Sequence, residues 1–256
     1  MGLERLERSV WGDYLGRVNK TATSFPTLNQ TCENSIKAMW LINSWILDSV
    51  KVQWGLKPLP YHQVFVSIYF KRNIVYLQSS HGLASIGFID PSSNLNRTIY
   101  ETILRGYLFM MEKNEADEYF QVIGTKDEDS YFFKKGMRYI RNKLYEPKAQ
   151  ESQKKLYKLL CISAHADIKG ANLDYPSYLA SRVEDKLKIM LNLAYGNFQM
   201  MAECFIDYLD SKTRTLLKDT MEQIASTLSS VPLFEPDKFE YRLKIQLKKG
   251  NFLGVL

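Results

Sequence analysis

The chain has 256 residues, of which 45% are apolar and 24% charged, and its formal net charge is +6. This composition excludes a disordered protein, and the length is enough to bury a substantial core. Turn formers are scarce, with 13 glycines and 8 prolines, which favours few, long elements of the helical kind. We therefore predict an all-α protein in which residues 1–256 form a single domain, a multi-helix bundle.

The cysteines and the N-terminal sequence indicate a compartment. Cys32, Cys161 and Cys204 lie far apart and form no CxxC pair, which argues against a disulfide framework and against a zinc site. The charged N-terminal stretch lacks the apolar region of a signal peptide, and no apolar run is long enough to span a membrane. We expect a soluble cytoplasmic protein with no membrane partner, no metal and no cofactor.

Helical periodicity dominates the chain from one end to the other. In chain order it predicts helices over residues 3–19, 32–53, 61–79, 93–112, 115–123, 129–146, 150–166, 176–195, 197–210, 212–229 and 236–248. Tyr61–Leu77 and Phe239–Leu247 also carry strand-like patterns, but neither has an obvious partner strand, so we predict helices for both. The polar residues 147–155 are either a solvated helix start or a hinge between two helical layers.

The predicted helix over residues 93–112 is apolar around most of its circumference, which is typical of a helix buried in the middle of a domain. Arg97, Glu101 and Arg105 lie on its edge, four residues apart, and therefore share one face. We expect Glu101 to pair with one of the two arginines inside the bundle. Such a group is either a structural ion pair or a polar site in which arginine binds an anion.

A second helix brings a histidine to the edge of the core. Tyr157, Cys161 and His165 are four residues apart and share a face, and His165 stands at the predicted helix end. There it could be a structural residue favoured by the helix dipole, or a general base, because histidine titrates near neutrality. We predict that it faces Arg97 and Glu101, which would place a base, an anion-binding group and an orienting carboxylate together.

These two helices carry a resemblance. The stretch YKLLCISAH, Tyr157–His165, is similar to a Tyr-Arg-x-x-Ser-x-x-x-His pattern of an uncharacterised helical prokaryotic family, domain of unknown function 5677, and Arg97–Glu101 matches its upstream Arg-x-x-x-Glu helix. Lys158 and Cys161 depart from that pattern. The resemblance implies a role near phage-defence or toxin–antitoxin systems and names no reaction.

A looser resemblance connects the same stretch with HEPN ribonucleases, which are all-α and use an Arg-x4–6-His motif, typically at a dimer interface. Lys158 and His165 have the required spacing, but lysine cannot make the bidentate phosphate contact of arginine.

Two charged segments flank the middle of the chain. Lys134, Lys135, Arg138 and Arg141 follow a run of aromatic residues and could line one exposed strip that neutralises and stacks on RNA. The acidic cluster Glu112, Glu115, Asp117 and Glu118 is interpreted as a solvated helix junction rather than a set of metal ligands.

The sequence thus favours a non-catalytic helical regulatory or partner-binding protein, which the first resemblance would place in a prokaryotic stress or defence system. The alternative is a metal-independent ribonuclease of HEPN type that uses His165. The corresponding partners are another protein or RNA, and the second resemblance implies a homodimer.

Overall fold

The computed structural model describes residues 24–54, 59–86, 88–145, 147–164 and 175–229. These residues form nine α-helices, one 3-10 helix and no strand, so the predicted all-α bundle is confirmed. The helices are α2 (Pro26–Trp54), α3 (Tyr61–Ser85), α4 (Ile89–Met111), α5 (Lys113–Val122), α6 (Glu128–Lys134), α7 (Met137–Leu144), α8 (Pro147–Ala164), α9 (Tyr175–Phe205) and α10 (Ser211–Ser229), with the 3-10 helix at Ile206–Tyr208.

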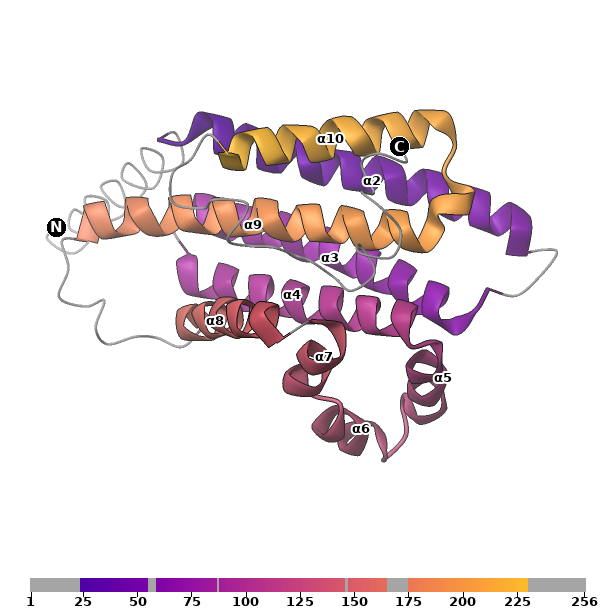
Figure 1. Cartoon of the computed structure of the whole chain (residues 1–256). Coiled ribbons are helices and arrows are strands. Elements are labelled where there is room, and N and C mark those ends of the chain that lie inside the picture. Colours follow the sequence, from indigo (N-terminus) through magenta and orange to yellow (C-terminus); the bar gives the residue numbers. More distant parts are fainter. Residues whose placement is uncertain (1–23, 55–58, 87, 146, 165–174, 230–256) are drawn as a thin grey trace, which may run out of the picture.

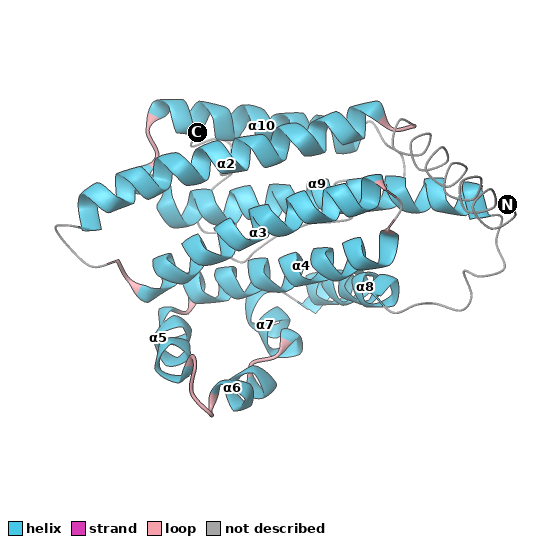
Figure 2. Ribbon diagram, turned by 180° about the vertical axis from the view of Figure 1, so that it is seen from behind, coloured by secondary structure: helices cyan, strands magenta, loops and turns pink. Residues whose placement is uncertain are grey.

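The long helices stack in layers, as Figures 1 and 2 show from opposite sides. Helices α2 and α10 pack together on one side, α3 and α9 fill the middle, and α4 and α8 lie beyond them. The short helices α5, α6 and α7 leave this stack below α4 and return to it (Figure 1). We call this excursion, Lys113–Leu144, the α5–α7 arm.

Helix α4 is the buried central helix that the sequence predicts. Every residue from Ile99 to Phe109 is buried except Glu101, which is partly exposed. The helix packs against α3, α5, α7, α8 and α9. Because neighbours surround it on most sides, its few charged residues must be satisfied at the helix contacts or at the edge of the bundle.

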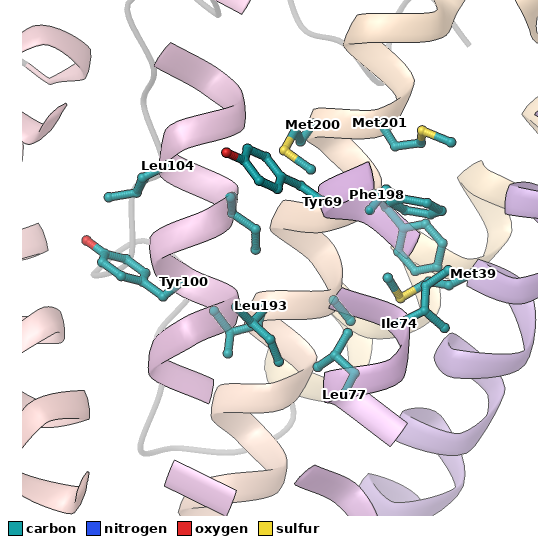
Figure 3. Close-up of a cluster of buried hydrophobic side chains, with 14 of the residues drawn as sticks. Met39, Tyr69, Ile74, Leu77, Tyr100, Leu104, Leu193, Phe198, Met200 and Met201 are labelled. Atoms are coloured by element: carbon teal, nitrogen blue, oxygen red, sulfur yellow. The ribbon is translucent and has the colours of Figure 1, made fainter. Parts of the chain in front are cut away.

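The core combines long aliphatic and aromatic side chains from α2, α3, α4 and α9 (Figure 3). Helices α4 and α9 approach closely at Gly106, where an added Cβ would lie 2.3 Å from the sulfur of Met200. At Gly196 of α9 the same addition would make only ordinary contacts, at 3.8 Å, with Ile103. An alanine at position 106 would therefore require the Met200 side chain to move.

A chain of polar side chains crosses this apolar core. Thr102 of α4 donates a hydrogen bond to Oδ1 of Asn73 in α3 (2.6 Å), and Asn73 donates to Oδ1 of Asn197 in α9 (3.1 Å). All three residues are buried. Side-chain hydrogen bonds thus join three helices, α3, α4 and α9, across the core.

Several predicted helices differ from the observed ones. The segment Tyr61–Leu77 is helical, as predicted, within α3. The predicted helix over residues 129–146 is interrupted at Gly136, which adopts an extended backbone before α7. The predicted break at Gly196 is absent, because α9 continues through it. The predicted helices over residues 3–19 and 236–248 lie outside the described residues.

Residues 147–155, the candidate hinge, form the first turns of α8, which starts at Pro147, a position where proline's missing N–H costs no helical hydrogen bond. Within the described ranges, no helix combines the length and the apolar character that crossing a membrane requires.

Candidate functional site

The charged face of α4 meets α8 in a closed triangle of hydrogen bonds. Nε of Arg97 donates to Oε1 of Glu101 (2.9 Å), and Nη2 of Arg97 donates to the hydroxyl of Tyr157 (3.2 Å). That hydroxyl donates in turn to the same oxygen of Glu101 (2.8 Å). Glu101 therefore pairs with Arg97 and not with Arg105, and α8 supplies a third member from its Tyr157 row.

The triangle lies at the edge of the bundle rather than inside it. The side chains of Arg97 and Glu101 keep 35% and 30% of their surface exposed. The hydrogen bond to Glu101 raises the pKa of Arg97, and burial together with its hydrogen bond to Glu101 raises the pKa of Tyr157 to about 12. The predicted position inside the bundle is therefore wrong, and the pair keeps contact with solvent.

Two arginines also lie close to the ring of Tyr157. The guanidinium carbon of Arg97 lies 5.6 Å from the centre of the Tyr157 ring, and that of Arg141 lies 4.9 Å from it. The ring of Tyr100 packs beside Tyr157, with ring centres 5.9 Å apart. The Tyr100 hydroxyl donates to Oε1 of Gln153 one turn earlier in α8 (2.9 Å), so α4 and α8 are held together over consecutive turns.

His165, the predicted base, lies outside the described residues, one position beyond the end of α8. The described part of its helical row faces the predicted target: Tyr157 contacts both Arg97 and Glu101, and Cys161 is partly buried. Without a histidine, the triangle holds no group suited to abstract a proton near neutral pH, because its carboxylate and its guanidinium satisfy each other. The predicted composite site therefore stays a prediction.

The four basic residues predicted to bind RNA do not form one exposed strip. Lys134 and Arg138 are exposed. Lys135 is partly buried and bonded to Glu115 at 2.9 Å. Arg141 is partly buried and packs on the Tyr157 ring. Only half of the predicted cations are thus presented to solvent.

Glu115 is a buried charged centre that the sequence interpretation missed. It is 7% exposed, accepts hydrogen bonds from Lys135 (2.9 and 3.0 Å), and accepts from the hydroxyls of Tyr139 and Tyr131. Burial tends to raise the pKa of Glu115, but the hydrogen bonds from Tyr139 and Lys135 bring it below its usual value. The interpretation of the acidic cluster as solvated is wrong for Glu115, whose partners are 16 to 24 residues away.

Arg105, the other arginine of the α4 face, has no carboxylate partner among the residues that the structure describes. Its guanidinium carbon lies 4.4 Å from the centre of the Phe132 ring of α6, and the residue is 9% exposed. Its Nη1 atom is buried and has no hydrogen-bond acceptor within the described part of the chain.

The two histidines that the structure describes, His62 and His81, both have lowered pKa values. Nε2 of His81 lies 2.7 Å from Oδ1 of Asn29, and burial lowers the pKa of His81. Burial, and then the charge of Lys113, lower the pKa of His62. Among the residues that the structure describes, no three histidine, cysteine or acidic side chains gather in a way that could hold a metal ion.

No family model matches the chain, and neither a curated protein nor a solved structure is similar enough to it to count as a match. The resemblances to the uncharacterised prokaryotic family and to HEPN ribonucleases therefore stay predictions.

Proposed function

We propose that this chain is a non-catalytic helical protein that binds another protein through its α5–α7 arm. The observation that supports this proposal is Phe133 of α6, which exposes 92% of its surface. Its neighbours on the same short helix are packed, since Tyr131 is buried and Phe132 is partly buried. A large aromatic side chain held wholly in solvent is the kind of group that anchors a protein interface.

The short helix α6, which carries Phe133, is held at both of its ends. Glu115 of α5 binds Lys135, which follows α6 directly. At the turn between α5 and α6, Glu128 accepts hydrogen bonds from the Tyr119 hydroxyl (3.0 Å) and from the backbone N–H of Gly124 (2.7 Å), whose φ of 72° suits glycine. A contact residue on a braced support loses little conformational entropy on binding, which favours affinity.

The charge around Phe133 favours a protein over a nucleic acid. Residues 126–135 contain three basic and three acidic side chains, so the segment carries no net charge. One of the three basic residues, Lys135, is already paired with Glu115. Binding to a polyphosphate backbone relies on an excess of unpaired cations, and this segment lacks one.

The polar face of α4 supports the non-catalytic part of the proposal. Arg97 is neutralised by Glu101 and hydrogen-bonded to Tyr157, so its guanidinium is already used inside the molecule. A role in prokaryotic stress or defence follows from the family resemblance alone and stays a prediction.

A photo-crosslinking amino acid placed at Phe133 tests the proposal, with the same substitution at Phe88, which is 45% exposed at the start of α4, as the matched control. A protein captured at position 133 and not at position 88 is then purified, and its affinity is measured for the parent, Phe133→Ala and Phe88→Ala. We expect Phe133→Ala to weaken binding by about tenfold or more, as for an anchor residue, and Phe88→Ala to leave it unchanged. Equal affinity for all three proteins would refute the proposal.

A second candidate function is the ribonuclease that uses His165. It is favoured by the contacts of Tyr157 with Arg97 and Glu101, because the sequence spacing predicts that His165 follows Tyr157 on the same face of the helix. Purified parent protein, His165→Ala and Glu101→Gln are incubated with RNA and compared. Cleavage by the parent alone would support catalysis, whereas equal results for parent and His165→Ala would exclude it.

A further inference from the structure

Arg105 is a buried cation in the middle of the central helix. It lies one turn after Glu101 on the same face of α4, and it is 9% exposed. Arginine stays protonated at any ordinary pH, so burial cannot be relieved by loss of the charge. A buried guanidinium that lacks acceptors is among the costliest arrangements in a folded protein, and such groups are normally paired with a carboxylate or another anion.

The carboxylates around Arg105 are used elsewhere. Glu101 accepts from Arg97 and Tyr157, as described above. The charges of Glu115 and Glu128 influence the pKa of tyrosine hydroxyls that the charge of Arg105 also influences. Both carboxylates are hydrogen-bonded to other residues of the arm. No described carboxylate lies within ion-pairing distance of Arg105.

The Phe132 ring compensates only part of this deficit. A guanidinium at 4.4 Å from the ring centre gains from the negative face of the ring. The ring accepts none of the five in-plane N–H groups, and Nη1 is buried with no acceptor from any described residue. The other two nitrogens, which no described residue binds either, are not sealed from solvent.

A second cation acts on the same surroundings. Burial raises the pKa of the Tyr69 hydroxyl, and the positive charges of Arg105 and Arg72 oppose that increase. The same two arginines oppose the increase for Tyr119. Arg72 is exposed on α3. Two cations from adjacent helices therefore act on one group of tyrosine hydroxyls, with Arg105 deep and Arg72 at the surface.

We propose that Arg105 binds a small oxyanion, a phosphate or a carboxylate, at the contact between α4 and the α5–α7 arm. In this site the guanidinium donates to two oxygens at once, and Arg72, exposed on α3, adds positive charge to the same surroundings. This inference does not rest on the proposed partner contact at Phe133. It assigns to Arg105 the anion-binding role that the sequence raised for the polar face of α4.

Thermal unfolding of the full chain tests the proposal. The parent, Arg105→Met and Arg138→Met are titrated with inorganic phosphate, with acetate and with chloride at matched pH and ionic strength. Arg138 is the control because it is an exposed arginine of the arm. In the parent and in Arg138→Met, we expect phosphate or acetate to raise the melting temperature to a plateau. Arg105→Met should show only the gradual rise that such salts give to most proteins. The anion that gives the plateau identifies the class of ligand.

The behaviour in chloride gives an independent result. If the anion site at Arg105 is empty in chloride, Arg105→Met removes an unsatisfied buried charge. The melting temperature of this variant should then equal or exceed that of the parent. A marked fall in its melting temperature would mean that the guanidinium is structural, and would overturn the proposal. So would the lack of a plateau in the parent, or a plateau that persists in Arg105→Met.

A second variant tests the same site without removing the positive charge. Arg105→Lys keeps the charge but cannot bind two oxygens at once. Titration calorimetry of the parent with the anion that gives the plateau should show one site per chain. Arg105→Lys should bind the same anion at least about tenfold more weakly. Equal affinity of parent and variant would overturn the proposal.

Discussion

The side chain of Glu101 accepts two hydrogen bonds while 30% of its surface stays in solvent. We expect Glu101→Ala to lower the free energy of unfolding by about 1 kcal/mol, because a solvated ion pair contributes little and Arg97 can be rehydrated. Urea unfolding measures the change. Glu151→Ala is the control, since its pair with Lys154 is exposed, and its change should stay within about 0.5 kcal/mol of zero. A loss of about 3–5 kcal/mol at Glu101 would instead indicate a buried pair.

Glu115, unlike Glu101, is buried, and its contribution to the free energy of unfolding should depend on pH. A carboxylate whose pKa is lower in the folded chain than in the unfolded one stabilises the fold above the unfolded pKa. That contribution is lost as the pH falls through the folded pKa. The pKa of Glu115 is lowered, because the hydrogen bonds from Tyr139 and Lys135 outweigh burial.

We expect Glu115→Gln to cost about 2 kcal/mol at neutral pH. The difference from the parent should stay constant down to about pH 5 and shrink below about pH 4.3, the usual glutamate value. Urea unfolding at a series of pH values measures it. His62 and His81 titrate in both proteins, so their effect cancels in the difference. A difference that does not change down to about pH 3 would show that the pKa of Glu115 is not lowered.

Sequence reasoning located the charges but not their surroundings. The spacing of Arg97 and Glu101 predicted their pairing, because residues four apart on a helix are neighbours whatever the fold. The spacing could not predict that Tyr157, 56 residues later, would join them. Nor did it distinguish the buried Glu115 from the exposed Glu112, since the partners that bury Glu115 belong to other helices.

At the scale of the elements, two glycines behaved in opposite ways to the prediction. Gly136 interrupts a helix that the sequence predicts to be continuous, whereas Gly196, where the sequence predicts a break, lies inside the continuous helix α9. Glycine costs only about 1 kcal/mol in a helix interior, so packing can override it. Packing of α9 against α4 favours a continuous helix at Gly196. At Gly136 the chain must instead turn so that α7 returns to α4.

The contact between α4 and α9 allows a matched test. Gly106→Ala and Gly196→Ala make the same change inside two buried, touching helices, and both should gain about 0.5–1 kcal/mol of helix propensity. At Gly196 the new methyl group would have ordinary contacts, so we expect a net gain. At Gly106 it would meet the sulfur of Met200 at 2.3 Å, and we expect a net loss of about 1–3 kcal/mol.

Thermal unfolding of both glycine variants under one set of conditions compares their stabilities with that of the parent. If Gly106→Ala proves as stable as Gly196→Ala, Met200 has moved aside without cost and the close approach does not limit the packing.

At the scale of the whole molecule, the salt dependence of RNA binding tests whether the excess of basic residues serves to bind RNA. The logarithm of the binding constant for single-stranded RNA falls linearly with the logarithm of the salt concentration, with a slope of about −0.7 for each phosphate contact. Four contacts would give a slope near −2.8, whereas the exposed Lys134 and Arg138 alone would give about −1.4. We expect any binding through the arm to show the shallower slope.

Fluorescence anisotropy with a labelled single-stranded RNA over a range of salt concentrations measures this slope. Lys135→Ala and Arg141→Ala should leave it unchanged, because Lys135 is bonded to Glu115 and Arg141 packs on Tyr157. A steep slope that becomes shallower in both variants would show that all four basic residues contact RNA.

The helical class of the molecule and its buried central helix followed from the sequence, because the scarcity of turn formers and the apolar circumference of α4 are local properties. The course of the α5–α7 arm did not follow. It depends on pairs such as Glu115 with Lys135 and Arg105 with Phe132, which are 20 and 27 residues apart and have no periodic signature.

The hydrogen bonds from Thr102 to Asn73 and on to Asn197 bear on how this sequence can change. Aliphatic helix faces can slip by one turn with little change in buried area, but a slip here would leave dry amides unbonded. Replacing all three residues by hydrophobic ones could raise the melting temperature while admitting rival alignments of α3, α4 and α9. Selection for heat resistance alone would therefore tend to remove these residues, whereas selection for one defined arrangement would retain them.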